Sequence, residues 1–222
     1  MSAGDPDETQ SLNARSAMVA GQLERRGIRD PAVLAAMRDV PREHFVDAPL
    51  YDAYADAALP IQSGQTISQP YIVARMTELL AVGPGSRVLD VGTGSGYQAA
   101  VLATLGCEVT SIERHESLAA SARQRLARLG YGDRIEIVVG DGSLGWPAGA
   151  PWDGILVAAA APSVPPSLRQ QLGMRRRLVI PVGSREHQEL LAVERVGEAE
   201  WTERPDGPCV FVPLVGAEGF PG

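Results

Sequence analysis

The sequence predicts an α/β protein whose mostly parallel, twisted sheet has helices on both faces and an antiparallel edge at its C-terminal end. Between residues 86 and 159, short apolar runs alternate with helical stretches, as in successive βαβ units. The strand-like runs after residue 175 are joined by connections too short for helices, which favours antiparallel pairing. A chain of 222 residues can bury a core of this kind without disulfides or metal ions.

Helices are predicted ahead of the sheet. Residues 1–10 are acidic and polar, and we expect them to form a disordered tail. Apolar residues at helical spacing predict a helix over 12–26 that ends at Gly27. Asp30-Pro31 combines an N-cap residue with a proline at the first helical position, so a second helix is expected to start there. Another helix is predicted over 68–82.

The sheet is predicted from short apolar runs. The expected strands are 86–92, 107–113, 134–140, 153–159, 176–183, 188–196 and 209–215. A helix rich in Ala and Arg is expected between the second and third of these runs. We therefore expect one domain over residues 11–222, made of a helical segment (11–82) and a sheet-containing core (83–222).

Composition and charge exclude several classes of protein. The net charge is −7, whereas tight binding to a phosphate backbone needs clustered Lys and Arg. The two cysteines, Cys107 and Cys209, are too few for a disulfide framework and lack metal-ligand spacing. The longest apolar stretch, 155–161, is far shorter than the roughly 18 residues of a membrane span, and the N-terminus does not resemble a signal peptide. We expect a cytoplasmic monomer that binds no nucleic acid, no membrane and no metal.

A glycine-rich loop follows the first strand of the core. In VLDVGTGSGYQAAVLA, Gly92, Gly94 and Gly96 permit positive φ at the carboxyl end of a strand, where open α/β sheets bind ligands. Dinucleotide loops have the spacing G-x-G-x-x-G, but here Tyr97 occupies the place of the last glycine. Asp90, just before the loop, would repel a pyrophosphate and suit an ammonium group. Taken alone, the glycines are also compatible with a tight strand-to-helix turn.

Acidic residues at the ends of the next two strands narrow the choice of ligand. Glu113 ends the second strand, and a carboxylate there can accept both hydroxyls of a ribose. Asp141 ends the third strand and could accept a hydrogen bond from an adenine amino group, with Gly142 leaving room for the ring. Together with Asp90 and the glycines, these residues describe a pocket for an adenosine that carries an amino acid and no phosphate. We therefore expect a Rossmann-like methyltransferase that uses S-adenosyl-L-methionine and releases S-adenosyl-L-homocysteine.

A cluster of small polar residues precedes the helix predicted over 68–82. GQTISQPYIVARM places Gln65, Thr66 and Ser68 before Pro70, which is more hydrogen-bonding groups than one N-cap needs. Hydroxyls and backbone N–H groups at a helix N-terminus suit a bound anion. The alternative is that Ser68 is a plain N-cap.

Six motifs give the sequence a resemblance to a known family. VPREHFV, LPIQSGQTISQPYIVARMTELL, VLDVGTGSGYQAAVLA, GDGSLGWP, AAAAP and IPVG resemble, in this order, the protein-L-isoaspartate O-methyltransferases over residues 15–215. The resemblance implies methylation of the free α-carboxylate of L-isoaspartyl residues in damaged proteins or peptides, after which the ester closes to a succinimide and repair begins. It also implies that Ser68 is the active-site serine and positions the carboxylate.

Other functions would use the same motifs. A peptide-tailoring methyltransferase acting on one dedicated precursor peptide differs only in substrate breadth, and this alternative stays open. A small-molecule or nucleic-acid methyltransferase is disfavoured by the acidic charge and by QTISQP. A binding module that has lost catalysis is disfavoured by the intact Ser68, Glu113 and Asp141.

The candidate site residues fall into two groups. The expected cofactor contacts are Gln65, Thr66, Asp90, Gly92, Gly94, Gly96, Glu113, Arg114, Asp141 and Gly142. The expected substrate contacts are Thr66, Ile67, Ser68, Ala160, Pro181 and Val182. The small side chains of AAAAP would let an extended peptide lie close to the backbone, with IPVG on the other side; a tight strand-to-helix turn also accounts for the alanines.

The chain departs from the family in one turn. The family usually has Gly-Gly before the LVIPVG strand, whereas this chain has Arg175 and Arg176 there. A turn built on positive φ is therefore expected to be rearranged around Gly173. Three adjacent arginines would also favour an acidic peptide.

Overall fold

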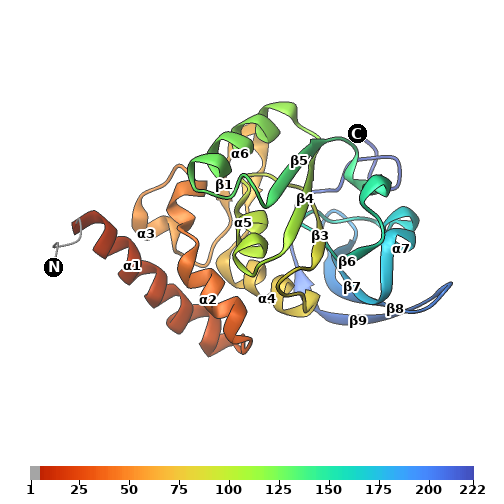
Figure 1. Cartoon of the computed structure of the whole chain (residues 1–222), viewed down its shortest axis with the longest axis horizontal. Helices are drawn as coiled ribbons and strands as arrows, with labels where there is room; N and C mark the ends of the chain where they lie inside the picture. Colours follow the sequence, from red (N-terminus) through yellow and green to blue (C-terminus); the bar gives the residue numbers. More distant parts are fainter. Residues whose placement is uncertain (1–5) are drawn as a thin grey trace.

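A seven-stranded sheet forms the centre of the computed structural model, which describes residues 6–222. Helices from the N-terminal part of the chain gather to one side of the sheet (Figure 1). The sheet strands are β3 (Arg87–Val91), β4 (Glu108–Glu113), β5 (Ile135–Val139), β6 (Trp152–Val157), β7 (Leu172–Gly183), β8 (Gln188–Gly197) and β9 (Glu200–Cys209). A separate two-stranded hairpin consists of β1 (Leu59–Pro60) and β2 (Thr66–Ile67).

The sheet has the predicted mixed topology. The strand order is β5-β4-β3-β6-β7-β8-β9, and every pair from β5 to β7 is parallel. β8 pairs antiparallel with both β7 and β9, which confirms the expected antiparallel edge. Because β4 and β6 lie on opposite sides of β3, the strand order reverses at the carboxyl end of β3, where such sheets bind their ligands.

The helices cover the two faces of the sheet unequally. They are α1 (Pro6–Met18), α2 (Pro31–Asp39), α3 (Leu50–Ala53), α4 (Pro70–Leu80), α5 (Tyr97–Thr104), α6 (Glu116–Arg128) and α7 (Pro166–Gln171). Successive residues of β3 point to opposite faces: Val88 belongs to the apolar cluster that includes residues of α4, α5 and α6, and Leu89 belongs to the cluster that includes Leu168 of α7 and Trp152. Within residues 6–222, no helix combines the length and apolar character needed to cross a membrane.

The N-terminal segment is helical further toward its start than expected. Residues 1–5 lie outside the described residues, but residues 6–10, which we predicted to be disordered, form the first turns of α1. Pro6 occupies the first helical position, where the missing N–H of proline costs no intrahelical hydrogen bond. The predicted stop at Gly27 is confirmed, with φ of 96°, and so is the N-cap of α2, where Asp30 accepts hydrogen bonds from two backbone N–H groups.

The prediction of a last strand over 209–215 is wrong. The strand lies earlier, in the polar stretch EWTERPDGPC, and residues 210–222 run as an irregular segment. β9 follows β8 after a two-residue connection, so hairpin geometry sets its position. As the edge strand of the sheet it bonds to one neighbour only, which allows it to contain Pro205 and Pro208.

The irregular stretch near the start of β7, which precedes LVIPVG, is not rearranged around Gly173. Arg175 itself adopts the left-handed conformation, with φ of 58°. The three arginines lie at the amino-terminal edge of the sheet, where Arg176 pairs with Asp153 at 2.9 Å and Arg177 contacts the Leu79 carbonyl oxygen at 3.3 Å. They are therefore remote from the carboxyl ends of the strands, and the expectation that they favour an acidic peptide loses its basis.

Candidate functional site

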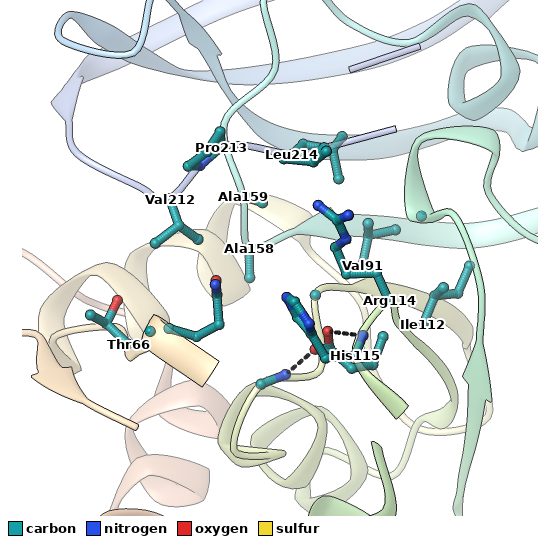
Figure 2. Close-up of a pocket in the computed structure, with 17 residues that line it drawn as sticks. Thr66, Val91, Ile112, Arg114, His115, Ala158, Ala159, Val212, Pro213 and Leu214 are labelled. Carbon is teal, nitrogen blue, oxygen red and sulfur yellow. Dashed lines mark hydrogen bonds between the residues drawn. The ribbon is translucent and has the colours of Figure 1, made fainter. Parts of the chain in front are cut away.

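A cavity of about 200 Å³ lies at the carboxyl ends of β3, β4 and β6 (Figure 2). Val91, Ile112 and Ala158 form its floor at the strand ends. The residues before β2 close one side, and the irregular C-terminal segment, 212–215, closes another. The walls are mostly apolar, and the charged side chains among its lining residues are those of Glu113 and Arg114.

The glycine loop has the conformation that the sequence predicts. The φ angles are 95° at Gly92, 52° at Gly94 and 89° at Gly96, in a region that residues other than glycine rarely adopt. Gly92 and Gly94 line the cavity. Gly96 lies behind it, where an added Cβ would meet Leu126 at 3.1 Å. The first two glycines thus keep the backbone close to the cavity, and the third allows α5 to pack against α6.

Glu113 connects the glycine loop to the end of β4. Its side chain is buried, and one carboxylate oxygen accepts a hydrogen bond from the Gly94 N–H at 2.9 Å. The other accepts one from the His115 N–H at 2.9 Å (Figure 2). A carboxylate offers about four acceptor positions, so two remain for a ligand in the cavity.

Asp90 does not line the cavity. It is fully buried behind the loop, where Ser111 donates a hydrogen bond to Oδ2 at 2.7 Å and also contacts the Thr93 hydroxyl. Oδ1 has no partner within the described residues. Burial raises the pKa of Asp90 to about 7, against the hydrogen bond from Ser111 and with a further increase from Glu113. The structure therefore does not present Asp90 directly to an ammonium group.

Asp141 anchors the C-terminal segment and also lies outside the cavity lining. Oδ1 accepts hydrogen bonds from the N–H and hydroxyl of Ser143, and Oδ2 accepts one from the Ala217 N–H at 2.7 Å. Burial would raise the pKa of Asp141, but these hydrogen bonds outweigh it and the pKa is lowered. Its neighbour Gly142 does line the cavity, and an added Cβ there would lie 2.5 Å from Val91 Cγ1.

The polar cluster before α4 does not cap that helix. The N-cap residue is Gln69, which makes no side-chain cap, and the Tyr71 N–H donates instead to Asp56 at 3.1 Å. Ser68 is therefore not the N-cap. Ser68 lines a second cavity, of about 40 Å³, together with Thr66, Ile67 and the glycine loop. This volume is a few times the roughly 10–15 Å³ that one water molecule needs, so the cavity suits a group the size of a carboxylate.

A third cavity, about 300 Å³ in volume, opens on the outer side of Ser68. We call it the outer groove. The first turn of α4, with Tyr71 and Ile72, forms one wall, and residues 208–212 form the other. Within the described part of the chain, Arg26 is the one charged residue that lines it; the guanidinium lies 3.5 Å from the centre of the Tyr71 ring and pairs with Asp56.

Three residues expected to contact a substrate lie away from these cavities. Ala160 is fully buried, and its N–H and carbonyl oxygen bond to Val212 and Leu214 at 2.8 and 2.7 Å. The extended segment beside the alanines is thus the chain's own C-terminal segment. Pro181 and Val182 pair with Ala161 in the same layer. Small residues of the AAAAP motif do reach the site, but they are Ala158 and Ala159.

Several lining residues were not predicted from the sequence. His115 follows Glu113 by two positions and could have been found by continuing the strand-end pattern. The C-terminal wall, 212–215, has no motif in the sequence and reaches the cavity through long-range contacts. Within residues 6–222 there is no cluster of three His, Cys, Asp or Glu side chains that could hold a metal ion.

The cavity suits an adenosine group without phosphates. Glu113 offers free acceptor positions for hydroxyl groups, and the surrounding side chains are largely apolar. Phosphate-binding sites in contrast present clustered backbone N–H groups and cations, whereas here the Gly94 N–H already donates to Glu113.

Comparison with known proteins gives consistent results across sequence and structure. The family model described as protein-L-isoaspartate(D-aspartate) O-methyltransferase matches residues 13–219. Protein-L-isoaspartate O-methyltransferase 2 of Pelobacter propionicus is 56% identical over 93% of this chain and 92% of its own length. The Methanoregula boonei protein-L-isoaspartate O-methyltransferase is 53% identical over 93% and 94%.

Two solved structures are similar along most of the chain. A protein-L-isoaspartate O-methyltransferase superposes with a TM-score of 0.84 at 27% identity, covering 92% of this chain and 67% of the other. A Plasmodium falciparum protein described as a beta-aspartate methyltransferase in complex with S-adenosyl-L-homocysteine superposes with a TM-score of 0.77 at 25% identity, covering 90% and 98%.

Proposed function

The chain belongs to the protein-L-isoaspartate(D-aspartate) O-methyltransferase family, and on that premise we propose how its cavities divide the work of the reaction. The reaction transfers a methyl group from S-adenosyl-L-methionine to the free α-carboxylate of an L-isoaspartyl residue. The neighbouring backbone amide nitrogen of the peptide then attacks the methyl ester and methanol leaves, which gives a succinimide and starts the return to aspartate. The cavity of about 200 Å³, here called the cofactor cavity, takes the cofactor. The cavity of about 40 Å³, here called the carboxylate cavity, takes the isoaspartyl carboxylate, and the outer groove takes the peptide on either side of it.

Glu113 and the glycine loop hold the cofactor. The free acceptor positions of Glu113 bind the two ribose hydroxyls, while Gly92 and Gly94 permit close contact with the backbone. Apolar side chains, including Ile112 and Leu214, enclose the adenine ring, and Gly142 leaves space for its edge. When bound, S-adenosyl-L-methionine supplies an electrophilic methyl group on a positively charged sulfur.

The carboxylate needs positioning and loss of water rather than activation by a base. An unperturbed carboxyl group has a pKa of about 4, so the nucleophile is already ionised at pH 7. Ser68 and Thr66 carry hydroxyls that can donate to it, and Ser68 is free for this because Asp56 caps α4. Holding the oxygen in line with the methyl group and excluding water supplies the rate enhancement.

One observation carries the proposal. Thr66 and Ala158 border all three cavities, and Ser68 borders the small cavity and the outer groove. The cofactor side and the peptide side therefore approach each other at a single place, next to the Ser68 side chain. A methyl group transferred at this place would pass from the cofactor cavity to the carboxylate cavity.

Matched peptides test the proposal. Labelled S-adenosyl-L-methionine is mixed with the protein and with one of two peptides that differ only in isoaspartate or aspartate at one position. The expected result is that base treatment releases labelled methanol from the isoaspartyl peptide alone, because only that peptide carries the base-labile methyl ester. Equal labelling of both peptides, or of neither, contradicts it. The relatives carry the general name of the repair enzyme, which favours this function over a methyltransferase for one precursor peptide.

A further inference from the structure

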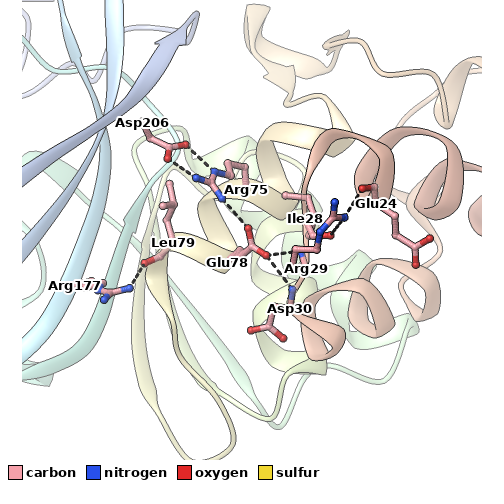
Figure 3. Close-up of polar contacts among 9 residues, drawn as sticks. All are labelled: Glu24, Ile28, Arg29, Asp30, Arg75, Glu78, Leu79, Arg177 and Asp206. Carbon is pink, nitrogen blue, oxygen red and sulfur yellow. Dashed lines mark hydrogen bonds and ion pairs between the residues drawn. The ribbon is translucent and has the colours of Figure 1, made fainter.

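A charged pair joins helix α4 to the edge strand β9. Arg75 Nε donates to Asp206 Oδ2 at 2.7 Å, and Nη2 donates to Oδ1 at 2.5 Å (Figure 3). Two parallel bonds between a guanidinium and a carboxylate are strong and fix the relative orientation of the two groups. The Asp206 side chain is only 9% exposed, so water screens this pair less than it would a pair at the open surface.

The pair continues into the N-terminal helices. Arg75 Nη1 donates to Glu78 at 2.8 Å, and the other oxygen of Glu78 accepts from the N–H groups of Arg29 and Asp30 at 2.6 and 2.9 Å (Figure 3). Burial would raise the pKa of Glu78, but these donors outweigh it and the pKa is lowered. Glu78 thus holds the Arg75 guanidinium through Nη1, while Nε and Nη2 bond to Asp206.

The local backbone of β9 turns Asp206 toward α4. In the pairing of β8 with β9, Leu190 lies opposite Gly207 and Leu191 opposite Pro205, which leaves Asp206 as the extra residue of a β-bulge. Gly207, with φ of 126°, completes the irregularity. Bulges commonly redirect a side chain near a functional site, and here the redirected side chain is the partner of Arg75.

Each partner lies on the element that leads into one wall of the outer groove, Arg75 on α4 and Asp206 on β9. Arg75 follows Tyr71 by four residues, so it lies one turn further along the same face of α4. Asp206 precedes Pro208, the first groove residue of the opposite wall, by two residues. Neither Arg75 nor Asp206 is among the residues that line the groove or the two cavities beside it.

We propose that Arg75 is a positioning residue whose bidentate bond to Asp206 sets the separation of α4 and β9, and with it the width of the outer groove that receives the peptide. The inference rests on the proposed function, because it takes the outer groove as the peptide site. The pair acts chiefly on peptide binding, because the cofactor cavity is built mainly on the ends of β3, β4 and β6 and shares Thr66, Ala158 and Val212 with the groove.

Steady-state kinetics with an isoaspartyl peptide test the role. Arg75→Met and Asp206→Asn are each expected to raise KM for the peptide about tenfold, the scale of a hydrogen bond to a charged group, with kcat changed by less than about threefold. The dissociation constant of S-adenosyl-L-homocysteine is expected to stay within about twofold. The double variant is expected to behave like either single variant, because both substitutions remove the same bond.

Arg169→Met is the matched control. Arg169 lies on α7 and also pairs with a residue of β9, Glu203, but α7 contributes no residue to the groove lining and Glu203 is not part of it either. It is expected to leave KM for the peptide unchanged. An unchanged KM in Arg75→Met, or a parallel loss of peptide and S-adenosyl-L-homocysteine binding, overturns the positioning role.

Amide hydrogen exchange gives a readout that does not depend on methyl transfer. The amides of residues 207 and 209–211 are expected to exchange about tenfold faster in Arg75→Met than in the unsubstituted protein and in Arg169→Met. If the exchange rates of these amides are unchanged in Arg75→Met, Arg75 does not restrain this wall of the groove, even if the peptide is methylated. Failure of the unsubstituted protein to methylate any isoaspartyl peptide refutes the proposed function instead, and the exchange result still decides whether Arg75 holds the wall.

Discussion

Replacing Arg175 with glycine is expected to stabilise the protein. Arg175 has φ of 58°, in the left-handed region, and its exposed side chain makes no hydrogen bond or ion pair with any described residue. The substitution Arg175→Gly therefore removes backbone strain without removing a contact. The neighbouring Arg176 provides the opposite case, since its φ is not in the left-handed region and it pairs with Asp153.

The expected change in free energy of unfolding follows from two opposing effects. Left-handed backbone costs a residue other than glycine about 1–2 kcal/mol. Ordering a glycine costs about 0.5–1 kcal/mol more than ordering another residue, because its unfolded chain is freer. The difference leaves a stabilisation of about 0.5–1 kcal/mol for Arg175→Gly. Arg176→Gly gains nothing from φ and loses a half-exposed ion pair, so it is expected to lower stability by about 1 kcal/mol.

Urea unfolding at pH 7.5 measures both variants against the unsubstituted protein. A rise in the midpoint for Arg175→Gly and a fall for Arg176→Gly, with unchanged slopes, is the expected outcome. In thermal unfolding, about 0.5–1 kcal/mol corresponds to about 1–4 °C for a chain of this size. If Arg175→Gly is neutral or destabilising at an unchanged slope, the strain assigned to this turn is absent and the reasoning is refuted.

Three further predictions concern the site. Ser68→Ala is expected to lower kcat for an isoaspartyl peptide about 10- to 100-fold while the dissociation constant of S-adenosyl-L-homocysteine, measured by calorimetry, stays the same; full turnover would remove Ser68 from the mechanism. Glu113→Ala is expected to weaken S-adenosyl-L-homocysteine binding by about 1–3 kcal/mol in the same experiment, and unaltered affinity would show that the ribose lies elsewhere. The folded pKa of Asp90, about 7, exceeds its unfolded value of about 4, so its contribution to stability is full below pH 4 and is lost as the pH rises through 7. Asp90→Asn is therefore expected to be more stable at pH 8, by at most about 4 kcal/mol, and to lack this loss in urea unfolding between pH 5 and 8; an equal loss in both proteins would contradict it.

Local patterns were sufficient for most elements of the fold. The alternation of apolar runs and helical stretches predicts the parallel part of the sheet because each run must be buried on both faces. Asp30-Pro31 predicts a helix start because both residues act on the backbone next to them. The glycine loop is predicted for the same reason, since positive φ is a property of the residue itself.

Where the prediction failed, a local signal competed with a distant contact. The apolar run 209–215 has more strand character than EWTERPDGPC, but the hairpin with β8 pairs the polar stretch and leaves the apolar run to line the outer groove and the cofactor cavity. Arg175 lacks any local preference for positive φ, yet the chain path through the turn imposes it. Strand propensity depends on such context more than helix propensity does.

The sequence by itself determined the identities of the glycine loop, Glu113 and the Ser68 cluster, because each is a short motif attached to the end of one element. Tertiary structure alone decided what these groups are free to do. Asp56 caps α4, so Ser68 is not used as a cap. The C-terminal segment bonds to Oδ2 of Asp141 through the Ala217 N–H and supplies a wall of the cavity. These contacts join residues that are far apart in the chain. Only the folded backbone brings them within a few ångströms of each other, so no local sequence pattern predicts them.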